Sequence, residues 1–293
     1  MNFRSDMLQA AQRAPKLLDD AFGLVHDFVW NQLNSDGGFK DRAGRSDLYY
    51  TVFGLESLLA LNVTPPLVTL EKYLQSFGTG EHLDFVHLTC LARCYAALPA
   101  EKLPWQRRAP MLQRMENFRT ADGGYHPSIG QPHGTIYAAF LALGAYQDLQ
   151  APLPDAPALV RSINRLRIPG GGYANDPSVP LGTTPATAAA CNVLRHLGQT
   201  PDAATALWLN DRAQPRGGFL ATPHAPLPDL LSTGVALHAL AGSNFSLVPL
   251  RESTLDFLDS LWSNRGAFHA TWADDALDCE YVYYALLALG HLS

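Results

Sequence analysis

Two kinds of helical segment alternate along the chain. The first kind carries charged residues spaced as on a solvent-exposed face, and it predicts helices near residues 15–33, 66–77, 108–119, 155–167, 202–212 and 248–263. The second kind is almost free of charge after its first turn, and it predicts helices near residues 47–62, 84–98, 134–149, 184–197, 229–242 and 276–292. Because a helix that is apolar on all sides is buried, the second set is expected to form an inner ring and the first an outer ring.

Glycine-rich corners recur between these segments. Gly37-Gly38-Phe39, Gly123-Gly124-Tyr125, Gly171-Gly172-Tyr173 and Gly217-Gly218-Phe219 have their second glycines 86, 48 and 46 residues apart, and 86 is two units of 43. A weaker corner follows at Gly266-Ala267-Phe268. One such unit is a helical hairpin, and a fixed period indicates a repeat architecture. The pattern therefore predicts an all-α fold, a single α6/α6 toroid of six helical hairpins over residues 1–293.

Composition and charge narrow the class of protein. Hydrophobic residues make up 47% of the 293 residues, which is ample for a large core. The formal net charge of −6 shows no basic footprint, so no nucleic-acid partner is expected. The four cysteines show no disulfide framework, and the charged N-terminus lacks the apolar run of a signal peptide. With no stretch of about 18 apolar residues to span a membrane, these features predict a cytoplasmic protein with reduced thiols.

In such a ring all inner helices begin on the same side, so the polar residues at their starts converge on one cavity mouth. A cavity with an apolar interior and a few convergent polar groups is the usual form of a ligand site. A single Ser, Thr, Asp or Asn at a helix start is explained by N-capping, which contributes about 1 kcal/mol. Only more polar groups than capping requires would indicate a functional site.

The start of the third inner helix carries a distinctive segment, Asp122-Gly-Gly-Tyr-His-Pro-Ser-Ile-Gly-Gln-Pro-His-Gly-Thr-Ile-Tyr-Ala-Ala-Phe140. It resembles the GGFGGGPGQxPHLAxTYAAV segment of protein prenyltransferase β subunits. The repeat pattern is similar, over nearly the whole chain, to that of the wider terpenoid-cyclase toroids. The resemblance implies an isoprenoid substrate in an apolar cavity, with His133 either contacting its diphosphate or capping the helix.

Two further segments resemble the zinc-binding motifs of these transferases, with altered ligands. Asp278-Cys-Glu-Tyr281 is similar to D-x-C-Y, and Ser46-Asp-Leu-Tyr-Tyr-Thr51 is similar to D-F-Y-H-T. Their order along the chain is reversed, but the first and last hairpins of a closed ring are neighbours. Glu280 stands at the cysteine position and Tyr50 at the histidine position. An oxygen donor set suits Mg²⁺ better than Zn²⁺, which prefers thiolate and imidazole, so the resemblance implies Mg²⁺ at Asp278 and Glu280 and makes Zn²⁺ less favoured. A one-residue shift of the helix start would instead offer the thiol of Cys279.

The strongest chemical signal is the acidic run Asp274-Asp-Ala-Leu-Asp-Cys-Glu280. It contains DDxxD, the pattern that binds magnesium diphosphate in isoprenoid synthases, and it is similar to the DxDD of class II cyclases, with Trp272 at the first Asp. Asp274, Asp275 and Asp278 are therefore candidate catalytic residues. Crowding by like charges raises a carboxyl pKa, and Asp275 is the candidate acid.

Two purely structural explanations of the acidic run are alternatives to this catalytic role. The helix dipole favours one or two acids at a helix start, by about 0.3–1 kcal/mol each, but four acids within seven residues repel one another. The other alternative is a salt-bridged seam, in which Arg42 and Arg45 of the first repeat face the acids.

Further candidates lie on the inner helices and beside their starts. Arg42 and Arg45 would supply positive charge for a diphosphate. An aromatic lining would stabilise carbocations by about 0.5–2 kcal/mol per ring, with core packing as the alternative, and its candidates are Tyr49, Tyr50, Phe53, Tyr137, Tyr281 and Tyr284. Trp272, beside the acidic run, is a further candidate for substrate binding. His87, Cys90 and Cys94 share one helix face, which favours core packing over a metal site because no fourth ligand is evident.

The resemblance to the toroid enzymes, together with the acidic run, implies an isoprenoid-handling enzyme that binds a prenyl diphosphate in its central cavity and transfers or cyclises it. A class II-like terpene cyclase is one alternative, and a non-catalytic toroid that binds a lipid or a peptide is another. A lipid substrate predicts transient contact with a membrane surface. The altered zinc ligands argue against an α-subunit partner.

Overall fold

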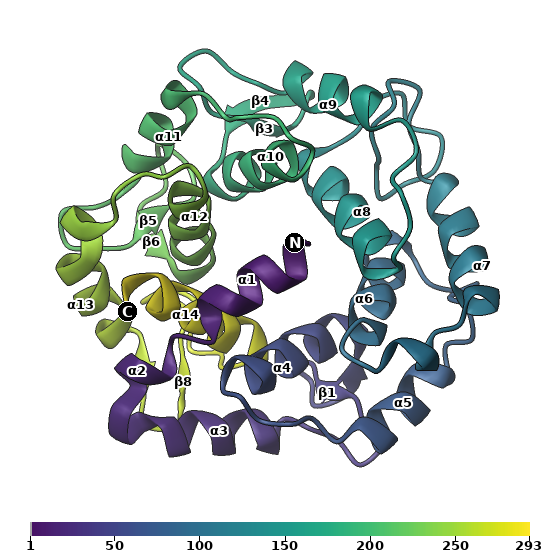
Figure 1. The fold of residues 1–293 in the computed structure, drawn as a ribbon. Helices are drawn as coiled ribbons and strands as arrows, with labels where there is room; N and C mark the ends of the chain where they lie inside the picture. Colours follow the sequence, from purple (N-terminus) through teal and green to yellow (C-terminus); the bar gives the residue numbers. More distant parts are fainter. Residues whose placement is uncertain (1) are drawn as a thin grey trace.

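The nearly charge-free segments form the inner helices of a closed ring in the computed structural model, which describes residues 2–293 (Figure 1). Neighbouring inner helices pack against one another all the way round, and the last packs on the first. The prediction of an all-α toroid is therefore confirmed. The inner helices are α4 (Leu48–Ala60), α6 (Phe85–Tyr95), α8 (Ile136–Asp148), α10 (Thr184–His196), α12 (Leu230–Gly242) and α14 (Cys279–Leu292).

The amphipathic segments form the outer ring, as their charge pattern predicts (Figure 1). These helices are α3 (Phe22–Asn31), α5 (Leu67–Gln75), α7 (Trp105–Glu116), α9 (Ala156–Arg165), α11 (Ala203–Asn210) and α13 (Arg251–Ser260). Shorter helical turns complete the connections: α2 (Pro15–Leu18), η1 (Asp19–Ala21), η2 (Ala100–Lys102) and η3 (Val248–Leu250).

The glycine-rich corners place an aromatic side chain between the two rings. Phe39 is fully buried, and its backbone N–H donates to Thr51 Oγ1 on the next inner helix at 2.9 Å. Tyr173 and Phe219 repeat this bond with Thr187 and Thr233. Four small antiparallel hairpins form here, pairing β1 (Phe39–Lys40) with β2 (Ser46–Asp47), β3 (Ala174–Asp176) with β4 (Val179–Gly182), β5 (Phe219–Leu220) with β6 (Pro228–Asp229), and β7 (Trp262–Ser263) with β8 (Ala267–Phe268).

A helix at the N-terminus, α1 (Phe3–Ala11), crosses the central opening (Figure 1). No feature singled out in the sequence predicts it. The Phe3 N–H donates to Gln147 Oε1 near the end of α8, and Ala10 lies against Gly290 near the end of α14. α1 therefore closes the end of the ring at which the inner helices finish, and their starts surround the opposite end, the mouth.

Within residues 2–293, no helix combines the length and the apolar character that crossing a bilayer requires.

Candidate active site

The side chains that cap the inner helices surround the mouth. Each accepts a hydrogen bond from a backbone N–H of the first turn, which satisfies one of the donors left free at a helix start. These N-caps are Asp47, Asp84, Thr135, Thr183, Asp229 and Asp278. Capping therefore accounts for each of them taken singly.

The acidic run of the last repeat meets the first repeat across the seam of the ring. Arg42 Nε donates to Asp278 Oδ2 at 2.9 Å, and Arg42 Nη2 donates to Asp274 Oδ2 at 3.1 Å. The Arg42 guanidinium also lies over the Tyr281 ring, 5.8 Å from its centroid. The Asp278 side chain is only 3% exposed, so the ion pair with Arg42 compensates a buried charge. The salt-bridged seam anticipated as an alternative is present.

Other candidates from the acidic run and the first repeat lie away from this network. Asp275 is exposed to solvent in the loop before α14. Trp272 is 48% exposed, and its Nε1–H donates to Ser260 Oγ at 2.8 Å. Arg45 pairs with Asp41 at 3.2 Å instead of facing the acids of the last repeat.

Metal binding at Asp278 and Glu280 stays a prediction. Across residues 2–293, no three His, Cys, Asp or Glu side chains lie together as a metal ion would require. The residues present therefore do not fit Mg²⁺ in this arrangement, since Arg42 already holds an oxygen of Asp278 and Tyr49 holds one of Glu280. Cys279 is fully buried, and burial raises the pKa of its thiol.

Glu280 is a second buried acid at the mouth, beside Asp278. It is 8% exposed, and its Oε1 accepts a hydrogen bond from the Tyr49 hydroxyl at 2.7 Å. Burial raises the pKa of Glu280 to about 7; the hydrogen bond from Tyr49 opposes this rise, and the charge of Asp278 adds to it. A carboxyl group in this environment is available in both protonation states near neutral pH.

An apolar cavity of about 290 Å³ occupies the centre of the ring. Tyr283 and Tyr284 line it from α14, and Glu280 lies one turn closer to the mouth on the same helix face. Phe53 packs edge-on against Tyr49 and at a tilt against Tyr284, with ring centroids 5.0 and 5.6 Å apart. Of the predicted aromatic lining, Tyr49, Phe53, Tyr137 and Tyr284 reach this cavity.

The remaining candidates of the mouth lie outside the cavity lining. Tyr50 is partly buried near the seam, and burial together with Asp278 raises its pKa. The His133 side chain is 54% exposed, with Nδ1 3.6 Å from Asp122 Oδ2. His133 is therefore a residue of the third hairpin's corner rather than of the cavity.

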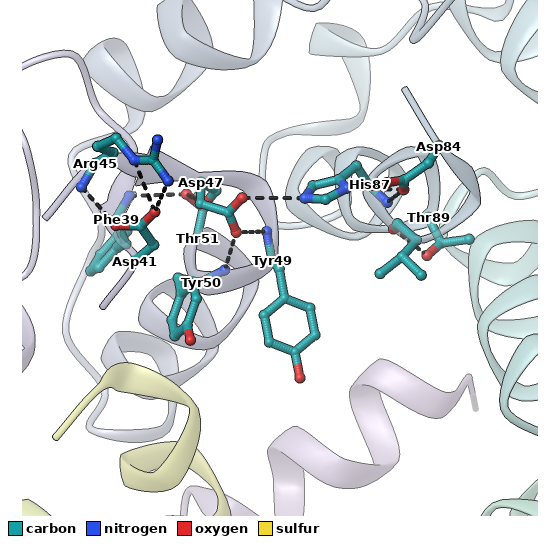
Figure 2. A network of polar contacts seen from close by, with 11 residues as sticks. Phe39, Asp41, Arg45, Asp47, Tyr49, Tyr50, Thr51, Asp84, His87 and Thr89 are labelled. Carbon is teal, nitrogen blue, oxygen red and sulfur yellow. Dashed lines mark hydrogen bonds and ion pairs between the residues drawn. The ribbon is translucent and has the colours of Figure 1, made fainter. Parts of the chain in front are cut away.

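His87 connects the starts of α4 and α6 (Figure 2). Its Nε2 lies 3.2 Å from Asp47 Oδ2, and its Nδ1 lies 2.9 Å from Asp84 Oδ1. The hydrogen bond with Asp47 and the pairing with Asp84 raise the pKa of His87 to about 9, so it is an imidazolium at pH 7. Cys90 lines the cavity and Cys94 is buried, in keeping with the core alternative for this helix face.

Several cavity residues were not singled out from the sequence. They are Glu56, Arg93, Asp148 and Asn192. The sequence feature that could have identified them is a polar residue within an otherwise apolar inner helix. Glu56, for example, lies seven residues after Tyr49, two helical turns further along the same face of α4.

Comparisons with known proteins agree with this architecture. Residues 22–75 and 186–293 match the family model described as prenyltransferase alpha-alpha toroid domain. A comparison with curated proteins finds no match.

Among solved structures, a protein from Actinoplanes is similar over 94% of this chain and 98% of its own, with 18% identity and a TM-score of 0.68. The type II terpene cyclase MstE from Scytonema, in complexes with its product merosterolic acid A and its substrate geranylgeranyl dihydroxybenzoate, is similar over 97% of both chains, with 13% identity and a TM-score of 0.68. Candida albicans protein geranylgeranyltransferase-I complexed with GGPP is similar over 97% of this chain and 82% of its own, with 16% identity and a TM-score of 0.53. At these identities the likeness establishes the shared fold.

Proposed function

Because the chain belongs to the prenyltransferase α/α-toroid domain family, we propose that it is an isoprenoid enzyme that cyclises a linear chain held in its central cavity. The observation that carries the proposal is Glu280, a buried carboxyl group that is hydrogen-bonded to Tyr49, a residue of the cavity lining, and whose pKa burial raises to about 7. Structural neighbours of the same fold include a terpene cyclase and a protein geranylgeranyltransferase.

Glu280 is the general acid of the proposed reaction. Its neutral carboxyl group donates a proton to a terminal double bond or epoxide of the substrate, which leaves a cation on the adjacent carbon. The next double bond attacks this cation and closes a ring, and the final cation loses a proton to water. The Glu280 carboxylate then takes up a proton from solvent at the mouth. General acid catalysis of this kind contributes about 10²–10⁴-fold to a rate.

The tyrosines and phenylalanines of the cavity support this chemistry. A carbocation over an aromatic face gains about 0.5–2 kcal/mol per ring, and Phe53, Tyr283 and Tyr284 line the cavity. The cavity of about 290 Å³ is slightly smaller than the range of about 300–1,000 Å³ for ligand pockets, which favours a single chain with little water around it.

Transfer from a prenyl diphosphate is the second candidate, and the charges of the mouth favour it less. A diphosphate needs cations that are free to bind it. Arg42 is shared by Asp274 and Asp278, and Arg45 is paired with Asp41. Cyclisation started by a proton requires no such cation.

Product analysis tests the proposal. The protein is incubated with geranylgeraniol, its terminal epoxide and geranylgeranyl diphosphate, and the products are separated by mass spectrometry. A ring product with the mass of its substrate is expected, and Glu280→Gln is expected to lower its rate at least about 100-fold. Glu101→Gln, at an exposed position, is the control. Release of diphosphate with transfer to an acceptor would favour the second candidate, and full activity of Glu280→Gln would overturn the assignment of the acid.

A further inference from the structure

The side chains that the inner helices present to the cavity are apolar near the mouth and polar at the opposite end, which is called the floor here. Near the mouth and in the middle the helices present aromatic and aliphatic side chains, such as Tyr137, Leu231 and Val235. At the floor, five of them end in a polar side chain that lines the same cavity: Glu56 on α4, Arg93 on α6, Asp148 on α8, Asn192 on α10 and His238 on α12. The polar floor and the mouth are about 10 Å apart, the rise of two helical turns from Tyr49 to Glu56.

Each carboxylate of the floor is paired with an arginine. Arg4 of α1 binds Glu56 Oε1 through its Nε at 2.5 Å, and Arg93 Nε binds Asp148 Oδ2 at 2.5 Å. The Glu56 and Asp148 side chains are only 3% and 1% exposed. Two cations therefore compensate two carboxylates, and no net charge is left for an ionic ligand.

The floor has more hydrogen-bond acceptors than donors that reach them. Over residues 2–293, Glu56 Oε2, Asp148 Oδ1 and Asn192 Oδ1 are buried oxygens without a hydrogen-bond partner. All three residues are more than nine-tenths buried, and all three line the cavity. Buried acceptors are almost always paired, because an unpaired one keeps its desolvation cost without a compensating bond. The floor therefore has three spare acceptors, and a ligand that completes it must bring donors.

We propose that this floor is a binding site for the neutral, hydroxyl-bearing head group of an isoprenoid chain. The inference rests on the proposed function, and it specifies how the bound substrate is oriented in the cavity. The hydroxyl lies at the floor against Glu56, Asp148 and Asn192, and the terminal double bond of the tail lies at the mouth beside Glu280. An anionic head group is disfavoured, because it would bring further acceptors to oxygens that already lack donors.

Three probes with the same tail test the floor: farnesol, farnesyl methyl ether and farnesyl diphosphate. Their dissociation constants are measured by calorimetry on the full chain. Farnesol is expected to bind about tenfold more tightly than the ether, which cannot donate, and more tightly than the diphosphate. Asn192→Leu removes one acceptor while keeping its approximate shape, and it is expected to reduce the preference for farnesol about threefold. Asn164→Leu, on the exposed side of α9, is expected to keep it.

A crystal structure of the wild-type protein with farnesol provides a measurement that does not depend on a variant. The farnesol oxygen is expected within hydrogen-bond distance of at least one of the three spare oxygens. Equal affinity for farnesol and its ether, or ordered water alone on these oxygens, would overturn the floor site and leave the proposed function standing. Tighter binding of the diphosphate would overturn the neutral head group. Failure of all three probes to bind would overturn both proposals.

Discussion

At the scale of single residues, the neighbours of Glu280 set its charge. Burial raises its pKa from an ordinary value of 4.5 to about 7, against the hydrogen bond from Tyr49. Between these two values the folded protein holds a proton on Glu280 that the unfolded chain has released. Because the folded state binds more protons, stability falls as pH rises from about 4.5 to about 7 and is then constant with respect to this group.

Glu280→Gln is therefore expected to stabilise the protein while removing its activity. Glutamine keeps an acceptor for Tyr49 but has no charge to bury. The gain in the free energy of unfolding is expected to reach up to about 3 kcal/mol at pH 8 and to vanish near pH 4.5. Urea unfolding across this pH range measures it, with Glu101→Gln as the control. An equal gain at both ends of the range would show that the charge of Glu280 is not its source.

Tyr49→Phe is expected to move the pH dependence of activity. The Tyr49 hydroxyl stabilises the charged form of Glu280, so its removal raises the Glu280 pKa further. Activity that depends on the neutral acid is then retained to a pH higher by about one unit or less. Tyr284→Phe removes a hydroxyl from the same cavity and leaves the Tyr49–Glu280 bond in place. A shift of the same size in both variants would contradict this explanation.

The sequence predicts part of this site and omits part, for identifiable reasons. Ring closure brings Arg42 to Asp274 and Asp278, and the topology alone was enough to anticipate that meeting. The partner of Glu280 depends on helix rotation: the motif resemblance places Tyr50 beside Glu280, but the next residue back along the helix, Tyr49, makes the contact. Tyr49 is predicted only as part of the aromatic lining. Asp275 and Trp272 lie in the loop before α14, where no helical periodicity fixes the direction of a side chain.

At the scale of elements, α1 depends on a few polar contacts with the inner ring. Its first residues meet the C-terminal halves of the inner helices, where Arg4 pairs with the buried Glu56 and Asp6 with Arg195. His196 Nε2 lies 3.3 Å from the same Asp6 carboxylate, and the hydrogen bond with His196 lowers the pKa of Asp6. These contacts hold α1 across the opening, where its Met7 lines the cavity.

Arg4→Ala is expected to cost about 3–5 kcal/mol in the free energy of unfolding, because it leaves Glu56 buried without its counter-charge. Arg167→Ala is the matched control. It removes an arginine from an exposed pair with Asp202, with side chains 39% and 49% exposed, and its cost is expected to be about 0–1 kcal/mol. Chemical denaturation measures both. Similar costs for the two variants would mean that Glu56 has solvent or another partner available at the floor.

The helices of the two rings follow from sequence periodicity, but α1 does not. A long segment that is apolar all round, such as residues 229–242, has few alternatives to a buried helix, and α12 spans Leu230–Gly242. α1 has nine residues and both charged and apolar side chains, so its local sequence does not favour a helix in a central cavity. Its position depends on Arg4 and Asp6 meeting partners from helices far along the chain.

At the scale of the whole molecule, closure of the ring distinguishes this fold from an open helical repeat. In an open array each repeat contacts only its neighbours, so the ends unfold separately. Here α14 packs on α4, and Arg42 joins the first repeat to the last through Asp274 and Asp278. Loss of the Arg42 ion pairs at the seam is therefore expected to destabilise both the first and the last repeat.

Arg42→Ala is expected to lower the free energy of unfolding by about 1–3 kcal/mol, because the buried Asp278 carboxylate loses its charged donor. Because the ring is closed, unfolding is expected to remain one cooperative transition, shifted to lower denaturant without a change in slope. Circular dichroism follows the helices, and tryptophan fluorescence follows positions spread around the outer part of the ring: Trp30, Trp105, Trp208, Trp262 and Trp272. Arg45→Ala, in the same loop with its side chain 81% exposed, is the control and is expected to have little effect. If the fluorescence transition of Arg42→Ala preceded the loss of helix, the seam would open on its own, and cooperativity would have to come from the packing of neighbouring hairpins instead of from closure.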